Sequence, residues 1–251
     1  SVVSDYSILF QLGVMLVAVI SSLVVFYKPR ILYEKTDGGY AVRFYTFGLS
    51  NYKTAVIPST YKGEKVVSLR GNTFSNMPYL ESVELPNTIV EIRGQAFKND
   101  SNLVSVNIPS NLKYLGGGAF YGCSSITSII LPDTLTYMGG EVFYKAVSLK
   151  SIKLSENLTE IRGDSFEYCT SLKSIVIPDN IERIGGHAFY GDSSLSEVTL
   201  TANSKLREIG SSAFRRCSNL YSITIPFTTY VNERAFKESP TFIKYFYDFD
   251  F

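Results

Sequence analysis

Three cysteines and a single histidine are the scarce residues of this 251-residue chain among those whose types suit nucleophilic, redox or metal chemistry. Cys123, Cys169 and Cys217 each follow a recurring phenylalanine by three residues, and they lie two recurrences apart. If the recurrences mark stacked turns, alternate turns are separated by about 10 Å, since neighbouring strands lie about 4.8 Å apart. A disulfide joins Cα atoms no more than roughly 7 Å apart. We therefore expect three unpaired thiols with no catalytic or metal-binding role.

The single histidine, His187, stands two residues before its phenylalanine, where the other recurrences carry a mixture of mostly polar residues. The residues at this offset are Asn72, Gln95, Gly118, Glu141, Asp164, Ser212 and Arg234. Such a mixture is typical of an exposed position, so His187 is expected at the surface. It could act as a general base only if a carboxylate or hydroxyl group from another turn converged on it. The sequence contains no P-loop or dinucleotide fingerprint, and it predicts no enzyme, no cofactor and no metal site.

The recurring phenylalanine is the strongest pattern in the chain, with spacings of 22 to 25 residues. It occurs at Phe74, Phe97, Phe120, Phe143, Phe166, Phe189, Phe214 and Phe236. A period in the twenties is typical of a solenoid, in which each repeat forms one turn and buries its apolar face against its neighbours. We therefore predict a repeat solenoid with capped ends, because each terminal repeat lacks a neighbour on one side.

Each repeat carries a short alternating apolar pattern after its phenylalanine. Val83 and Leu85 stand nine and eleven residues after Phe74, and the same offsets are apolar in the later repeats up to the seventh. Alternation puts such side chains on one face of a short strand, so one strand per turn predicts a parallel sheet along one side of the coil. In six repeats a glycine stands three residues before the phenylalanine, and we expect it to supply the positive φ of a tight turn. Those glycines are Gly71, Gly94, Gly117, Gly140, Gly163 and Gly186.

The pattern changes at both ends of the solenoid, which we place at residues 59–240. Residues 31–58 are expected to form an N-terminal cap hairpin, with a turn at the Thr-Asp-Gly-Gly sequence that begins at Thr36. Residues 241–251 are expected to form a capping strand, because aromatic residues alternate there and end in Phe249 and Phe251. Alternating aromatics on a sheet edge are also suited to contact another subunit.

The N-terminal segment differs from the repeats. Residues 8–26 carry no charge and are long enough, as a helix, to cross a hydrocarbon core of about 30 Å. No small-x-small cleavage pattern follows, so residues 1–30 are expected to be a retained transmembrane anchor. Lys28, Arg30 and Lys35 follow the span, and the positive-inside rule then puts the repeats in the cytoplasm. Removal of a basic leader before Ser1 would reverse this orientation, and we favour repeats on the extracytoplasmic, cell-surface side.

The repeats resemble the BspA-type leucine-rich-repeat family, whose pattern runs roughly Leu-x-x-Ile-x-Ile-Pro-x-x-Val-x-x-Ile-Gly-x-x-Ala-Phe-x-x-Cys. Residues 172–189 carry nearly every marker, and the resemblance covers about residues 55–240. Ser155 and Thr201 depart from it, since proline is usual there. The resemblance implies a right-handed leucine-rich-repeat coil, poor in helix apart from the N-terminal one, with a parallel sheet on the concave face. It also implies protein binding and cell adhesion without an active site.

Charge and strand pattern together select a candidate binding surface. Lys and Arg number 24 against 23 Asp and Glu, so no broad basic face is expected for nucleic acid. The expected partner is a protein or another surface ligand. On the concave strand face, a variable row is framed by serines, and specificity is expected in the variable row. This row consists of Glu84, Asn107, Ile130, Lys153, Val176, Thr199 and Thr224.

A second interpretation gives the ends of the chain the main role. The chain could be a structural subunit of a membrane-rooted assembly or of a pilin-like filament. In pilin-like subunits an acidic residue near position five neutralises a neighbour's amino terminus, and Asp5 stands at that place. The assembly contacts would then be Asp5, Phe249 and Phe251, and the apolar helix would hold homo-oligomers together.

Overall fold

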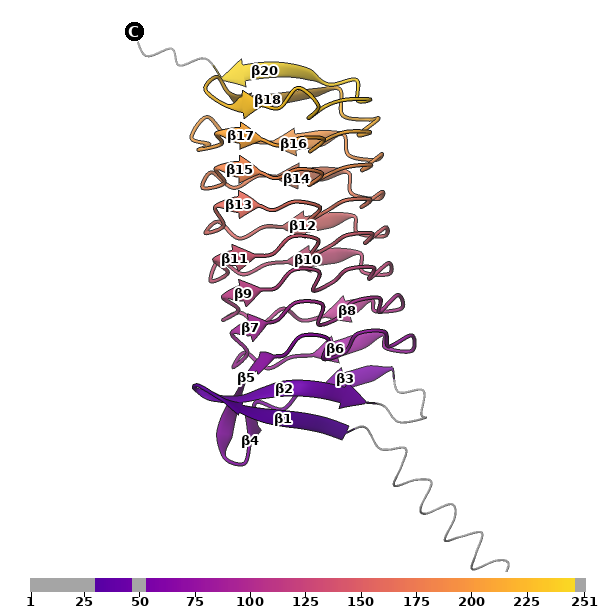
Figure 1. Cartoon of the computed structure of the whole chain (residues 1–251), viewed down its shortest axis with the longest axis vertical. Coiled ribbons are helices and arrows are strands. Elements are labelled where there is room, and N and C mark those ends of the chain that lie inside the picture. Colours follow the sequence, from indigo (N-terminus) through magenta and orange to yellow (C-terminus); the bar gives the residue numbers. More distant parts are fainter. Residues whose placement is uncertain (1–29, 47–52, 247–251) are drawn as a thin grey trace, which may run out of the picture.

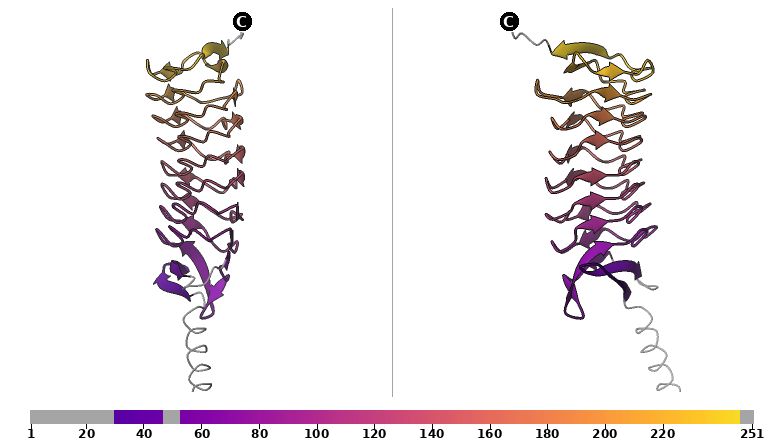
Figure 2. Two further views of the ribbon diagram at one scale, coloured as in Figure 1. Left: turned by 90° about the vertical axis from the view of Figure 1, so that its right-hand side faces the viewer. Right: turned by 60° about the vertical axis from the view of Figure 1, so that its left-hand side comes forward.

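The computed structural model describes residues 30–46 and 53–246. These residues form a column of stacked turns, built from strands and tight turns without a helix (Figure 1). Two ladders of short strands run along separate sides of the column (Figures 1 and 2). The predicted solenoid with a parallel sheet is thus confirmed. The expected helix over residues 8–26 lies outside the described residues.

The first ladder contains the strands predicted from the alternating pattern. Its strands are β3 (Thr54–Val56), β6 (Ser82–Glu84), β8 (Ser105–Val106), β10 (Ser128–Ile130), β12 (Ser151–Lys153), β14 (Ser174–Val176), β16 (Glu197–Thr199), β18 (Ser222–Pro226) and β20 (Phe242–Phe246). The paired strands are parallel and in register, so that Ser82 lies opposite Ser105 and Ser128 opposite Ser151. The middle residue of a typical strand, such as Val83, is buried.

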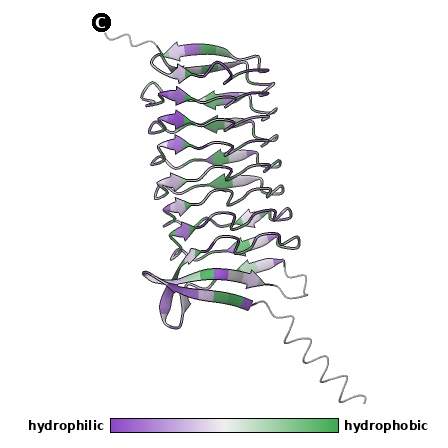
Figure 3. Ribbon diagram, viewed as in Figure 1, coloured by the Kyte–Doolittle hydropathy of each residue, from purple (hydrophilic) through white to green (hydrophobic). Residues whose placement is uncertain are grey.

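A second parallel ladder corrects the prediction of one strand per turn. Its strands are β5 (Glu64–Leu69), β7 (Glu91–Ile92), β9 (Tyr114–Leu115), β11 (Tyr137–Met138), β13 (Glu160–Ile161), β15 (Arg183–Ile184), β17 (Glu208–Ile209) and β19 (Tyr230–Val231). All of these strands except β5 have two residues. The first residue points outward, and the second is buried in every strand from β7 to β17. The outward residue of β13, β15 and β17 is hydrophilic (Figure 3). Two residues are too few to show a period of two, so the sequence pattern concealed this ladder.

The N-terminal hairpin joins the second ladder. Strands β1 (Arg30–Thr36) and β2 (Gly39–Thr46) pair antiparallel across the expected turn, with Thr36 opposite Gly39. Strand β2 then pairs in parallel with β5, which carries a short antiparallel partner, β4 (Thr60–Tyr61). The Tyr33 and Tyr61 rings stack at 3.9 Å. The hairpin therefore covers the first turn with hydrogen-bonded strands and aromatic rings.

The eight recurring phenylalanines form one continuous column of rings in the core. Centroids of neighbouring rings lie 5.0–5.6 Å apart, and their planes differ by at most 14°. The rings from Phe74 to Phe214 are fully buried, and Phe236 in the last turn is partly buried. Backbone bonds tie the same level together, as where the Phe97 amide donates to the Ala119 carbonyl at 2.8 Å. Residues at one offset therefore lie above one another, as predicted.

The prediction for the glycines three residues before the phenylalanines is wrong. None of them has a positive φ; that conformation falls on the next residue, with φ between 57° and 63° from Asn72 to Ser212. The glycines are instead needed for close approach between turns. A Cβ at any of these six positions would lie 2.9–3.2 Å from a carbonyl oxygen of the following turn. The residues after these glycines, such as Asn72 and Gln95, keep the left-handed conformation because their amides donate hydrogen bonds to carbonyl groups of the following turn.

Candidate functional site

The outward side of the first ladder, here called the strand face, carries the predicted variable row. In β6 the side chains of Ser82 and Glu84 lie outside while Val83 is buried, and β10 and β14 repeat this arrangement. Ile130 is 70% exposed and Val176 is 60% exposed. Ile130 lies opposite Lys153, and Val176 lies opposite Thr199. The structure therefore aligns these side chains along the column.

The register extends this row beyond the residues predicted from the sequence. Val56 in β3 lies opposite Glu84 at one end, and Lys244 in β20 lies opposite Thr224 at the other. Both were missed because the first unit contains an insertion and the last turn departs from the repeat. The alternation in β3 and β20 was the available signal, since it places Val56 and Lys244 on the outward side.

Asn107 belongs to the row but performs a different task. Its side-chain Oδ1 accepts a hydrogen bond from the Leu85 amide, and its Nδ2 donates to the Leu85 carbonyl, both at 2.6 Å. These bonds replace the backbone pairing of a strand, and β8 ends at Val106. The amide group of Asn107 thus joins two turns, which leaves it poorly suited to bind a ligand.

The middle of the strand face combines an apolar side chain with a cation. Lys153 is exposed beside Ile130, and its Nζ lies 3.4 Å from Oδ2 of Asp133. The backbone amide of Glu156 donates to Asp133 at 3.1 Å. That bond, with the nearby charge of Lys153, lowers the pKa of the Asp133 carboxyl. Because all of these charged groups are near the surface, Lys153 can exchange Asp133 for an acidic group of a partner.

The strand face is shallow and partly apolar. Three open depressions of about 470, 510 and 290 Å³ lie along it, over β3 to β8, β8 to β10, and β16 to β20. The exposed apolar side chains on this face are Val56, Ile130, Val176 and Phe242, and Val104 and Tyr221 directly precede two of its strands. Small-molecule sites are usually concave and enclose most of the ligand. A shallow face with spaced apolar side chains is better suited to the surface of another protein.

The three thiols are buried and unpaired, as predicted. Each Sγ donates to the carbonyl of a phenylalanine in the preceding turn, at 2.9 Å for Cys123, 3.2 Å for Cys169 and 3.1 Å for Cys217. Burial raises the pKa of all three thiols. Thiols held in this way are structural, because a reactive cysteine needs an accessible thiolate.

Two buried carboxyls share the offset of the cysteines, and sequence reasoning did not single them out. Oδ1 of Asp100 accepts from the Met77 amide, and Oδ1 of Asp192 from the Cys169 amide, both at 2.7 Å. Among the described residues, no donor reaches Oδ2 of either group. Desolvation raises the pKa of Asp100 to about 8 and raises that of Asp192 strongly. Asp100 is therefore mostly neutral near pH 7, as the thiols are, and burial disfavours the charged form of Asp192 as well.

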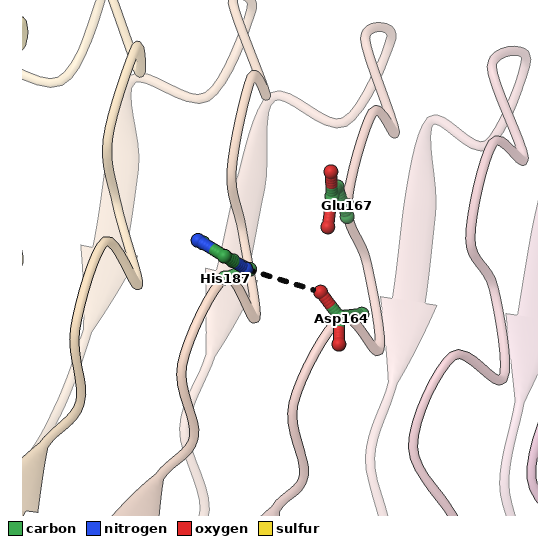
Figure 4. Close-up of side chains that lie close together, drawn as sticks. All are labelled: Asp164, Glu167 and His187. Atoms are coloured by element: carbon green, nitrogen blue, oxygen red, sulfur yellow. Dashed lines mark ion pairs between the residues drawn. The ribbon is translucent and has the colours of Figure 1, made fainter.

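His187 is exposed, as predicted, and carboxylates from the preceding turn converge on it. Its Nδ1 lies 3.4 Å from Oδ1 of Asp164, and Glu167 lies beside both (Figure 4). Such a convergence is the condition under which His187 could act as a general base, and the sequence did not predict that it occurs. The only signal was the shared offset of Asp164 and His187.

Other predicted contacts fall outside the described residues. These are Asp5, Phe249, Phe251 and the span 8–26. The described part of the chain offers no helical segment that could cross a bilayer. Of the expected C-terminal capping strand, residues 242–246 form β20, which pairs in parallel with β18.

The stacked turns, the phenylalanine column and the short parallel strands define a leucine-rich-repeat solenoid. Residues 41–170 and 141–247 match the model of the BspA type leucine rich repeat region, in six copies. The chain belongs to this family. No curated protein matches the chain.

Solved structures share the fold. A leucine-rich-repeat protein of T. pallidum, TpLRR, is 26% identical with a TM-score of 0.69, over 76% of this chain and 87% of the other. One from Bacteroides ovatus is 26% identical with a TM-score of 0.61, over 82% and 60% of the two chains. One from Eubacterium ventriosum is 22% identical with a TM-score of 0.62, over 77% and 60%. The chain thus spans 60% of the length of the second and third proteins.

Proposed function

We propose that the chain is a cell-surface binding protein that holds a protein partner against its strand face. The observation that carries the proposal is the row of outward side chains between Val56 and Lys244, in which four pairs of neighbouring strands lie in register over a uniform core. Membership of a repeat family supports a binding role, since such solenoids commonly use an extended strand surface for recognition. The proposal includes no catalytic step.

Ile130 and Lys153 are the proposed centre of the contact. Ile130 is the most exposed apolar residue of the row, and Lys153 lies directly opposite it on the next strand. A partner that covered both residues would bury the apolar surface of Ile130 and pair with the charge of Lys153. The partner surface is accordingly expected to present an apolar side chain next to an acidic group.

The proposal also includes anchoring in a membrane through residues 8–26, with the repeats on the extracytoplasmic side. Its support is the uncharged length of that segment. Membrane fractions of cells that make the full chain should keep it through alkaline carbonate extraction, and added protease should degrade the repeats in intact cells. Release by carbonate, or repeats protected until the cells are broken, would contradict this part.

The binding role is tested by changing the strand face while the core stays intact. We expect the double variant Ile130→Asp with Lys153→Glu to lose at least about tenfold in affinity for protein partners captured on cells. One substitution replaces an apolar side chain by a charged one, and the other replaces a positive charge by a negative one. The matched control is Tyr230→Asp with Lys113→Glu, which makes the same charge change at exposed positions on the second ladder or the turn beside it.

Both variants should unfold like the unmodified chain in a denaturant titration. If both variants lost affinity equally, the partner would contact another surface, or its binding would depend on the net charge of the chain and not on the strand face. Affinity retained in the strand-face variant would contradict the proposed function outright.

A further inference from the structure

Asp164, Glu167 and His187 form a cluster on the turn edge, away from the strand face. One donor atom of each residue lies within 4.8 Å of those of the other two. Asp164 and Glu167 come from one turn, and His187 from the next turn along the column (Figure 4). The cluster exists because Asp164 and His187 share the offset two residues before the phenylalanine, which places one directly after the other in the stack.

The backbone holds this cluster in place. Asp164 and His187 both have left-handed backbone conformations, with φ of 59° and 57°. The Asp164 amide donates to the Gly186 carbonyl at 3.1 Å, and the His187 amide donates to the Ser211 carbonyl at 3.0 Å. Both Cα positions are therefore fixed by bonds to the following turn, and only side-chain rotation remains to bring the donor atoms together.

Negative charge in the cluster is poorly compensated. In the described part of the chain, neither Asp164 nor Glu167 forms an ion pair with a lysine or arginine. Other acids of the column do have such partners: Glu160 and Glu208 both bind Arg183, and Glu238 binds Arg215 and Arg216. A cation bound at the cluster would take the place of such a basic partner.

We propose that Asp164, Glu167 and His187 bind a divalent transition-metal cation, with Zn²⁺ as the best match. One imidazole nitrogen and two carboxylate oxygens suit Zn²⁺, whereas Mg²⁺ and Ca²⁺ prefer oxygen ligands throughout. Tetrahedral Zn²⁺ with bonds of about 2.0–2.2 Å separates its ligand atoms by about 3.4 Å. Nδ1 of His187 and Oδ1 of Asp164 already lie 3.4 Å apart.

The remaining coordination position faces solvent. The side chain of His187 is 50% exposed and that of Asp164 is 38% exposed. Three protein ligands and one open position are the arrangement in which water, or a donor from another molecule, completes the shell of Zn²⁺. Because the cluster uses no residue of the strand face, its test is independent of the test of the proposed function.

The first experiment uses the unmodified full chain. Zn²⁺ is titrated into the protein while heat is recorded, and the imidazole resonances are followed by NMR. His187 is the only histidine in the chain, so these resonances report on this site alone. We expect one strongly bound Zn²⁺ per chain and a shift of the imidazole signals that saturates at the same ratio. Absence of binding, or binding that leaves the imidazole signals unchanged, would overturn the proposal.

The second experiment removes the ligands one at a time. His187→Asn, Asp164→Asn and Glu167→Gln should each weaken Zn²⁺ binding at least tenfold. Asparagine tolerates the left-handed conformation, so the first two variants should keep the fold. The matched control is Gln95→Asn, at the same offset in another turn with a φ of 60°. Equal affinity in the control and the His187 variant, or an equal loss in both, would contradict the site.

Discussion

The phenylalanine column and the outward row of the strand face come from the same repeats, but they differ in burial and in the variety of their side chains. The column has one residue type, ring distances that vary by only 0.6 Å between 5.0 and 5.6 Å, and burial along its length. The row has acidic, basic, amide, hydroxyl and aliphatic side chains on an equally regular backbone. The inner offset therefore maintains the stack, and the side chain at the outer offset differs from repeat to repeat, as the proposed binding role requires.

The largest effect is expected from breaking the column at its middle. Phe143→Ala removes a ring that is stacked on both sides, at 5.6 Å from Phe120 and 5.4 Å from Phe166. We expect a loss of about 3–5 kcal/mol in the free energy of unfolding, since the cavity cannot close between two fixed turns. A urea titration measures it. A loss below about 1 kcal/mol would show that the rings do not determine stability.

The buried carboxyls offer a pH-dependent test of the same core. The pKa of Asp100 rises from 3.8 to about 8 on folding, so the folded chain binds more protons than the unfolded chain between these values. Stability should therefore fall as pH rises from about 4 to 8, by at most about 1.4 kcal/mol per pH unit for this group. Asp100→Asn should reduce this slope, and it keeps an oxygen that accepts from the Met77 amide.

The control for that measurement is Asp133→Asn. Asp133 is exposed and its pKa lies below the usual value, so its removal should leave the slope between pH 5 and 8 unchanged. Urea midpoints at several pH values give both slopes. Identical slopes in the unmodified chain and the Asp100 variant would mean that the carboxyl is not neutral in the core.

A smaller effect is expected where two turns approach each other. Gly140→Ala would put a Cβ 2.9 Å from the Gly163 carbonyl oxygen, so one of the two turns must shift. We expect a loss of about 1–3 kcal/mol in the free energy of unfolding. Ser211→Ala is the control, because Ser211 occupies the equivalent offset in the seventh repeat and already carries a Cβ. Equal stability of the two variants would argue against close approach as the reason for glycine.

The smallest effect on stability is expected on the strand face. Ile130→Ala removes a side chain that is 70% exposed, and the free energy of unfolding should change by no more than about 0.5 kcal/mol. The same denaturant titration measures this change beside that of Phe143→Ala. If Ile130→Ala lost as much free energy of unfolding as Phe143→Ala, the outer offset would contribute to stability as the inner one does.

Most of this architecture could be predicted from the repeat, because the phenylalanine, the alternating apolar pair and the exposed polar position recur at the same offsets in successive repeats. Single copies and very short elements were not predictable. The two-residue strand Glu91–Ile92 is too short to show an alternating pattern. A glycine such as Gly140 is expected equally at a tight turn and at a close contact between turns, so the sequence does not tell the two apart. The meeting of Asp164 with His187 depends on side-chain rotation in two adjacent turns, which a shared offset permits but does not require.

The most direct test of the account compares the two sides of the solenoid in the unmodified protein. Lysines are labelled with a small amine-reactive reagent, with and without the captured partner, and labelling is quantified by mass spectrometry. Lys150, Lys153 and Lys173 lie exposed on or beside the strand face, whereas Lys113 and Lys205 are exposed away from it. The account predicts that the partner protects the first three and leaves the other two reactive. Protection of Lys113 and Lys205 with an unprotected Lys153 would contradict it.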